Sequence, residues 1–159
     1  MSQNCGPTLA GFNDFIYATP GPVQFNPLEL PTNNLVITIA YNVAFAQANQ
    51  ALACLGGGPS GPSIYALAVY NLATSLIINF AQDQAGRTYF TDLRVKLNLV
   101  QFQPGLVAST GDSSTSTSLL NQEFMRNLTI NDLQRLKDPY GRQYLMFAQA
   151  YGPTLVGIS

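Results

Sequence analysis

The chain has 159 residues, enough for one domain with a sizeable hydrophobic core. Apolar residues make up an ordinary 47% of it, but charged residues only 9%, against roughly 25% in typical soluble domains. The net charge of −1 argues against a broad electrostatic surface for nucleic acid. The sequence contains no histidine, which excludes Ser-His-Asp and Cys-His nucleophile arrangements and removes the commonest metal ligand.

The remaining motifs do not favour an enzyme either. Residues 56–63 are rich in glycine, but no Gly-Lys-Ser/Thr follows them as in a phosphate-binding loop. The two cysteines, Cys5 and Cys54, form no Cys-x-x-Cys motif. Asp132 and Asp138 flank a short predicted helix and are better explained as helix caps than as paired catalytic carboxylates. We therefore expect no catalytic site, no metal site and no cofactor.

Residues 1–31 are rich in proline and glycine, with scattered aromatic residues. This composition predicts an extended N-terminal arm that wraps over an apolar surface, with about one turn of helix at residues 13–17. Residues 32–159 are predicted to form a single, mainly α-helical domain.

Two long helices without charges are expected to follow the arm. The first should begin after residues 32–34, whose side chains can cap it, and continue to residue 55. The second should begin near Pro62-Ser63 and end near Gln84. The short Gly/Pro-rich connection between them predicts an antiparallel helical hairpin.

The function expected for the chain depends on whether these two helices lie in lipid, in the core of the chain or against a second copy. They have the length of membrane spans. Against that interpretation, they contain many carboxamide side chains, no Lys or Arg residues flank them, and the sequence has no tryptophan to anchor them at a membrane interface. The rest of a chain of this size is too small to bury both helices completely, so we expect a second copy to cover part of their apolar surface. The side chains predicted to lie in that oligomer interface are Leu72, Leu76, Ile77 and Phe80.

Residues 89–102 fit two patterns. Alternating apolar and charged residues fit a strand, whereas Phe90, Leu93, Leu97 and Val100 fit a helical stripe, and we favour the helix. The Ser/Thr-rich runs on either side of Gly111-Asp112 predict a small β-hairpin with a two-residue turn, or alternatively a flexible polar linker.

The C-terminal third is predicted to form two helices. The first follows the start signal at residues 129–132. The second begins with Asp138 as its cap and Pro139 at its first position. An aromatic stripe on one face of this helix is expected to pack on the helical hairpin, and it consists of Tyr140, Tyr144, Phe147 and Tyr151.

Residues 64–152 resemble head–tail connector proteins, also called adaptor or head-completion proteins, of tailed bacteriophages. The resemblance rests on three motifs in order: a Gly-Leu-Val step into a Ser/Thr-rich segment, a Leu-Gln-x-Leu-Lys turn, and a heptapeptide. In this sequence they are Gly105-Leu106-Val107, residues 133–137 and Pro139-Tyr140-Gly141-Arg142-Gln143-Tyr144-Leu145.

The resemblance implies a mainly helical subunit of a closed ring, usually of twelve copies, that lies below the portal at one capsid vertex. Such a ring extends the DNA channel and docks the tail or neck. The implied partners are further copies of this chain, a portal protein and a tail or neck protein; DNA would pass without sequence-specific binding, and no membrane is involved. The implied location is the head–tail interface of the virion, after assembly in the host cytoplasm.

The resemblance also indicates individual positions. Portal or tail contacts are expected at Gly105, Leu106, Val107, Leu155 and Val156, and the structural signature positions are Tyr140, Gly141 and Arg142. Two alternatives stay open: another minor virion protein, such as a tail-completion or capsid component, and a small membrane protein with two spans.

Overall fold

The computed structural model describes most of the chain, namely residues 6–18, 21, 23–48, 62–100, 109–112, 115–118 and 135–151. The predicted mainly helical fold is confirmed. In these residues the elements are α1 (Leu9–Ala18), α2 (Leu35–Gln47), α3 (Ile64–Phe80), α4 (Tyr89–Lys96), β1 (Ser109–Asp112), β2 (Thr115–Ser118) and α7 (Pro139–Tyr151).

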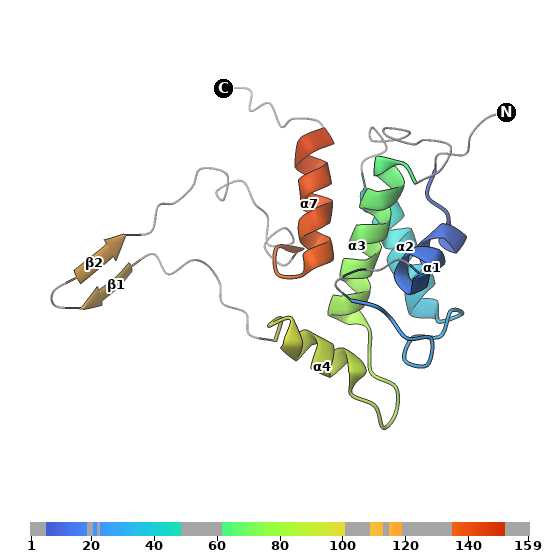
Figure 1. Cartoon of the computed structure of the whole chain (residues 1–159), viewed down its shortest axis with the longest axis horizontal. Coiled ribbons are helices and arrows are strands. Elements are labelled where there is room, and N and C mark those ends of the chain that lie inside the picture. The colour runs from blue at the N-terminus through green and yellow to red at the C-terminus, as the bar shows by residue number, and fades with distance from the viewer. Residues whose placement is uncertain are drawn as a thin grey trace.

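Helix α3 forms the centre of the molecule (Figure 1). It packs against α1, α2, α4 and α7, and twelve of its seventeen residues are buried. The apolar side chains of this helix therefore meet other helices of the same chain. From the sequence we expected one chain to be too small to cover this helix, but its four helical neighbours share that task.

Hydrogen bonds along α3 explain how a buried helix tolerates its polar residues. Asn71, Thr74 and Asn79 each donate a side-chain hydrogen bond to the backbone carbonyl four residues earlier, at 2.8 Å in all three cases. Such bonds pair side-chain donors with carbonyl groups of the same helix. Asn79 Nδ2 also donates to Asp138, and Asn71 Oδ1 stays buried without a hydrogen-bond partner in the described part of the chain. Ser63 caps the first turn, because its Oγ accepts from the backbone nitrogen of Ala66 at 3.1 Å.

Helix α3 ends four residues before its predicted end at Gln84. Arg94, which comes from α4, donates from Nε to the carbonyl of Ile78 at 2.8 Å and from Nη2 to the carbonyl of Ala81. The guanidinium thus satisfies carbonyl groups that a continuing helix would have bonded internally. The chain is then free to turn toward α4.

Helix α2 begins as the sequence predicts, with Asn34 as its cap; Asn34 Oδ1 accepts from the backbone nitrogen of Val36 at 2.9 Å. The helix is shorter than predicted, because it ends at Gln47 and Ala48 is already extended. Residues 49–61, which include the predicted end of this helix and most of the turn, lie outside the described residues.

The prediction of an extended N-terminal arm is wrong over residues 9–18, where the predicted turn of helix at 13–17 is part of a longer helix. Residues 9–18 form the ten-residue helix α1, whose Phe12 and Ile16 are buried in the core. The Phe12 ring stacks on Tyr41 of α2 and lies at a tilt to Tyr70 of α3, at ring-centroid distances of 6.0 Å and 5.7 Å. The apolar surface over which this segment wraps therefore belongs to the same chain.

Tyrosine hydroxyls hold the irregular parts of the N-terminal segment. Tyr17 Oη donates to the carbonyl of Leu30 at 2.5 Å, and burial raises the pKa of this tyrosine to about 12. The same arrangement recurs between Tyr41 and Pro7, Tyr70 and Thr8, Tyr89 and Gln24, and Tyr140 and Val23. A segment without regular structure needs such partners for its backbone groups.

Removal of the Tyr140 hydroxyl tests this arrangement. Tyr140 Oη donates to the carbonyl of Val23 at 2.7 Å and accepts from its backbone nitrogen at 3.3 Å, in a buried position. We expect Tyr140→Phe to lower the free energy of unfolding by about 1–3 kcal/mol in urea titrations, because it leaves both groups unpaired. Tyr89→Phe is the control, since it breaks a single bond of 3.1 Å at an exposed site. An equal loss in both variants would contradict this account.

The favoured helix at residues 89–102 is confirmed over Tyr89–Lys96, and Phe90 and Leu93 point into the core. An upstream carboxylate caps this helix: Asp83 accepts from the backbone nitrogen of Phe90 at 2.5 Å and from that of Thr91 at 3.1 Å. The hydrogen bond from the Thr91 hydroxyl, together with these two backbone bonds, lowers the pKa of Asp83.

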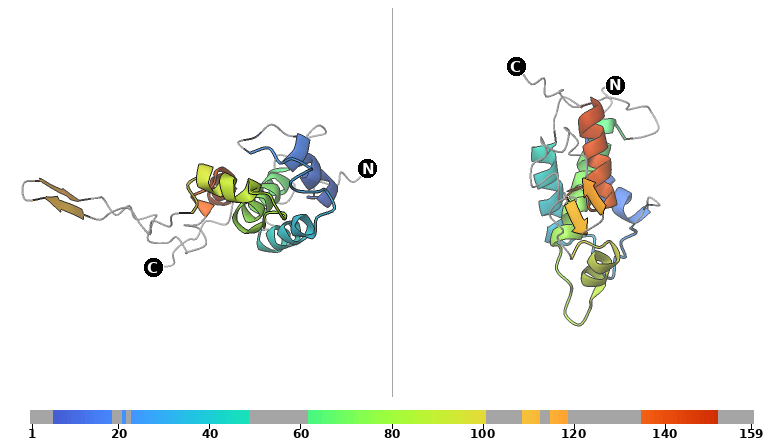
Figure 2. Two further views of the ribbon diagram at one scale, coloured as in Figure 1. Left: turned by 90° about the horizontal axis from the view of Figure 1, so that it is seen from below. Right: turned by 90° about the vertical axis from the view of Figure 1, so that its left-hand side faces the viewer.

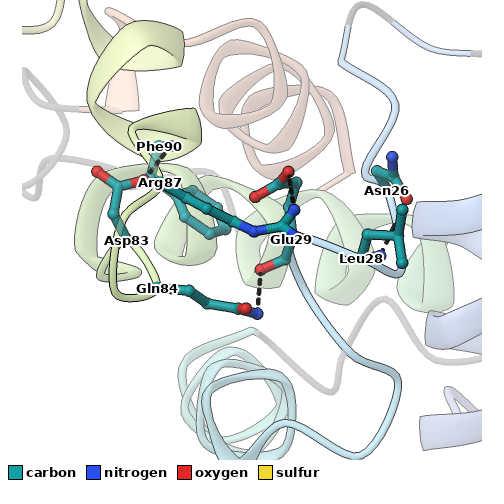
Figure 3. Close-up of polar contacts among 7 residues, drawn as sticks. All are labelled: Asn26, Leu28, Glu29, Asp83, Gln84, Arg87 and Phe90. Atoms are coloured by element: carbon teal, nitrogen blue, oxygen red, sulfur yellow. Dashed lines mark hydrogen bonds and ion pairs between the residues drawn. The ribbon is translucent and has the colours of Figure 1, made fainter.

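The connection between α3 and α4 is bound to the segment that follows α1 (Figure 3). Arg87 Nη1 lies 2.5 Å from Glu29 Oε1, and Gln84 Nε2 donates to the carbonyl of Glu29 at 3.0 Å. Asn26 Oδ1 accepts from the backbone nitrogen of Leu28 at 2.9 Å and closes the turn next to these contacts. These bonds fix the position of α4 relative to the N-terminal segment.

Strands β1 and β2 form an antiparallel pair in which Ser109 opposes Ser118 and Asp112 opposes Thr115. Gly111-Asp112 therefore lies within β1, so the predicted position of the two-residue turn is wrong. Figures 1 and 2 show this pair standing apart from the helices.

Candidate assembly surface

Helix α7 begins at a buried polar junction with α3. Asp138 is fully buried, and its Oδ1 accepts from the backbone nitrogen of Gly141 at 2.7 Å, which confirms its predicted role as the helix cap. Its Oδ2 accepts from Ser75 Oγ at 2.7 Å and from Asn79 Nδ2 at 3.4 Å, both on α3. The junction therefore couples the start of α7 to the centre of the molecule.

Burial raises the pKa of the Asp138 carboxyl, while the hydrogen bonds from Gly141, Ser75 and Asn79 oppose this shift. Gly141 has no room for a side chain, because a Cβ there would lie 2.8 Å from Asp138 Oδ2 and from the Cα of Arg135. Two of the signature positions, Tyr140 and Gly141, are thus buried structural residues, whereas Arg142 is exposed.

The predicted aromatic stripe of α7 is partly described. Tyr140 and Tyr144 are buried, Phe147 is half-buried, and the side chain of Tyr151 lies outside the described residues. The helix packs on α3. Arg135 lies over the Tyr144 ring, with its Cζ 5.2 Å from the ring centroid, and its Nη2 donates to Gln47 Oε1 at 2.8 Å. The stripe is therefore part of the packing of α7 on the body.

The outer face of α2 is the most unusual surface in the described part of the chain. Leu35, Ile39 and Val43 follow one another at intervals of four residues and are 69%, 52% and 37% exposed. Asn42 and Ala46 complete this face and are also exposed. The opposite face of the helix packs in the core through Ile37, Ala40 and Ala44.

Helix α2 is therefore apolar on both sides and carries no charge. A surface helix normally presents polar or charged residues to water. An uncharged aliphatic ridge can be buried against another surface without desolvating an ion, and such ridges are typical of protein–protein contacts. We call this ridge of Leu35, Ile39, Asn42, Val43 and Ala46 the α2 outer face.

The residues predicted for an oligomer interface are separated by the structure. Leu72 and Ile77 are fully buried within one chain, so in the folded subunit they are core residues and cannot contact a second copy. Leu76 is half-buried, and Phe80, at the end of α3, is 65% exposed. The sequence of α2 did indicate an exposed apolar face, because it is uncharged and has aliphatic residues at intervals of four. The interface was predicted on α3 instead, because the sequence of α3 is more apolar still.

The residues predicted to contact portal or tail proteins, Gly105, Leu106, Val107, Leu155 and Val156, lie outside the described residues, as does the predicted helix start at 129–132. In the described ranges, no group of three or more acidic or cysteine side chains is arranged to hold a metal ion. No helix within those ranges is both long enough and apolar enough to cross a bilayer.

Comparisons with known proteins found no matching family model, no matching curated protein and no matching solved structure.

Proposed function

We propose that this chain is a structural subunit of a head–tail connector in a tailed bacteriophage. In this proposal, copies of the chain form a closed ring below the portal, which extends the DNA channel and offers a docking surface to the tail or neck. The observation that carries the proposal is the uncharged α2 outer face, since it is a surface suited to burial against another subunit.

The resemblance to connector proteins adds support at the start of α7. Its sharpest motif, the heptapeptide that begins at Pro139, coincides with the junction in which Asp138, Tyr140 and Gly141 are buried. A motif that fixes how α7 packs on α3 is one that a family of similar subunits needs in common. The β1–β2 pair stands apart from the helical body, where a partner can reach it (Figure 1).

A closed ring places one further demand on the subunit. Each copy must present two different surfaces, because head-to-tail contacts close a ring, whereas a single self-complementary patch yields a dimer. Helices α2 and α7 both pack on α3 and lie on different sides of it, so the subunit has distinct lateral faces (Figure 2).

Deletion of the gene tests the proposal in an infected host. We expect capsid shells to assemble and to package DNA, while tails fail to attach, because the ring forms the docking surface and shell closure depends on other contacts. Electron microscopy of the lysate, with the gene supplied in trans as the control, measures this outcome. Failure of shells to form at all would contradict the proposal and would favour a capsid component.

A further inference from the structure

The start of α7 packs on α3 over a stripe of polar residues. Ser75 Oγ and Asn79 Nδ2, four residues apart on α3, donate to Asp138 Oδ2 at 2.7 Å and 3.4 Å. Asn71 lies one turn before Ser75 on the same side of the helix, and its buried Oδ1 has no hydrogen-bond partner in the described part of the chain. A buried oxygen without a partner costs free energy, and contact with water would remove that cost. This stripe can therefore be exposed to water more easily than an aliphatic surface can.

The buried apolar surface of α7 is small. In the described part of the chain, its large buried side chains are Tyr140, Tyr144 and Leu145, so only one of them is aliphatic. Helix α3, in contrast, meets four helices, and twelve of its residues are buried. Figure 1 shows α7 at one side of the helical body. Elements with few buried apolar contacts open at a lower free energy than the core does.

Neutral groups bind the fully buried carboxyl of Asp138. They are the Ser75 hydroxyl, the Asn79 carboxamide and the backbone nitrogen of Gly141, and α3 itself carries no charged residue. Burial raises the pKa of this carboxyl, against the effect of those bonds. When the carboxyl is protonated, Ser75 can rotate its hydroxyl and accept the new hydrogen, so the junction stays paired. When it is ionised, α3 offers its charge no cation in a place sealed from water.

The other titratable side chains near the junction belong to the segment around the start of α7. Arg142 is exposed and Lys137 is half-buried. Arg135 lies over the Tyr144 ring. Burial raises the pKa of Tyr140 above its ordinary value of 10.0. Arginine, lysine and tyrosine therefore keep one protonation state in the acidic to neutral range, in which the buried carboxyl titrates.

We propose that Asp138 is a pH-sensitive switch for the docking of α7: the helix stays on α3 while the carboxyl is protonated and undocks as a unit more readily once the carboxyl is ionised. Helices α1 to α4 stay folded in this opened state. Undocking transfers the carboxyl into water, where it releases its proton, so a higher pH favours the opened state. This conformational step goes beyond the proposed function and does not depend on it.

Hydrogen exchange of the full native chain, followed by mass spectrometry from about pH 4 to about pH 8, tests this switch. The intrinsic exchange rates divided by the observed rates give protection factors, in which the direct effect of pH on exchange cancels. We expect the protection factors of α7 to lie at least about tenfold below those of α2 at every pH, since α7 opens without unfolding of the whole chain. They should fall by up to about tenfold for each pH unit as the carboxyl ionises. In Asp138→Asn, the protection of α7 should no longer fall.

Asp14→Asn makes the same substitution at an exposed site on α1, and it should leave the exchange of α7 as in the native chain. Equal protection in α7 and α2 would overturn the proposal, because α7 would then open only when the whole chain unfolds. Protection of α7 that is constant with pH in the native chain, or that still falls in Asp138→Asn, would overturn it as well. The first two comparisons need only the native chain, so they decide the question even if Asp138→Asn does not fold.

Discussion

Leu72→Asp is expected to prevent the chain from folding. Leu72 is completely buried at the centre of α3, so the substitution both removes apolar contacts and places an unpaired carboxylate in the core. Loss of a buried leucine side chain costs about 2–5 kcal/mol, and a buried unpaired charge adds several more. Domains of this size have a total stability of only about 5–15 kcal/mol. Circular dichroism should therefore show loss of most of the helical signal.

Leu35→Asp is the matched control, because it makes the same substitution at a leucine that is 69% exposed. Leu35 is the first residue of α2, where an acidic side chain also interacts favourably with the helix dipole. We expect this variant to keep its helical signal and to change the free energy of unfolding by less than about 0.5 kcal/mol. Its self-association should nevertheless weaken, since the new charge lies on the α2 outer face.

The pair of variants also decides between two roles for α3. If Leu72→Asp gave a folded chain that had lost only its self-association, the helix would face a neighbouring copy, as the sequence led us to expect. A helical, monomeric Leu35→Asp beside an unfolded Leu72→Asp would place the core at α3 and the contact surface at α2.

Asp138→Ala is expected to have the second-largest effect. It removes the cap of α7 and leaves the Ser75 hydroxyl and the Gly141 backbone nitrogen without their acceptor in a buried place. The expected loss is about 2–4 kcal/mol in the free energy of unfolding, measured by urea titration. Asp138→Asn should cost far less, because its carbonyl oxygen can still accept from Gly141 and Ser75 can rotate its hydroxyl to bond the new amide. Equal losses for alanine and asparagine would contradict this account of the junction.

The same site predicts a pH dependence. Burial raises the pKa of Asp138 in the folded chain above its ordinary value, so the folded state keeps this proton to a higher pH than the unfolded state does. Its contribution to stability is therefore fully present below a pH of about 4 and is lost as the pH rises through the raised pKa. The free energy of unfolding of the native chain, minus that of Asp138→Asn, should fall over this interval.

The matched control for the pH series is Asp14→Asn, which changes an exposed aspartate on α1. A difference for Asp138→Asn that rises with pH would mean that the folded state favours the ionised carboxylate, and the pKa direction would then be wrong.

Local signals in the sequence were sufficient for most of the helices. Asn34, Ser63 and Asp138 were recognisable as caps because cap residues act on backbone groups two or three positions away, and those lie next to them in the chain. The helix over Tyr89–Lys96 followed from the spacing of Phe90 and Leu93 in the same way. Such features depend on neighbours in sequence.

Features that depend on distant partners were not accessible. Arg94 ends α3 from another helix, so the end of α3 had no local signal. Tyrosines of α2, α3 and α7 bind the segments on either side of α1, so the sequence indicated only one turn of helix at residues 13–17 and not the full length of α1. That α3 is buried by helices of its own chain was not predicted, for the same reason. Its composition indicated complete burial, but the partners that bury it come from four separate helices.

The central claim is that this chain builds a ring between the portal and the tail, and a map of the assembled particle by electron cryomicroscopy tests it most directly. The account predicts a closed ring of density below the portal, around the DNA path, into which α3 and its surrounding helices fit as repeated subunits with the α2 outer face buried between neighbours. Density for this chain on the capsid faces or in the tail tube, or an α2 outer face left open to solvent in the ring, would contradict it.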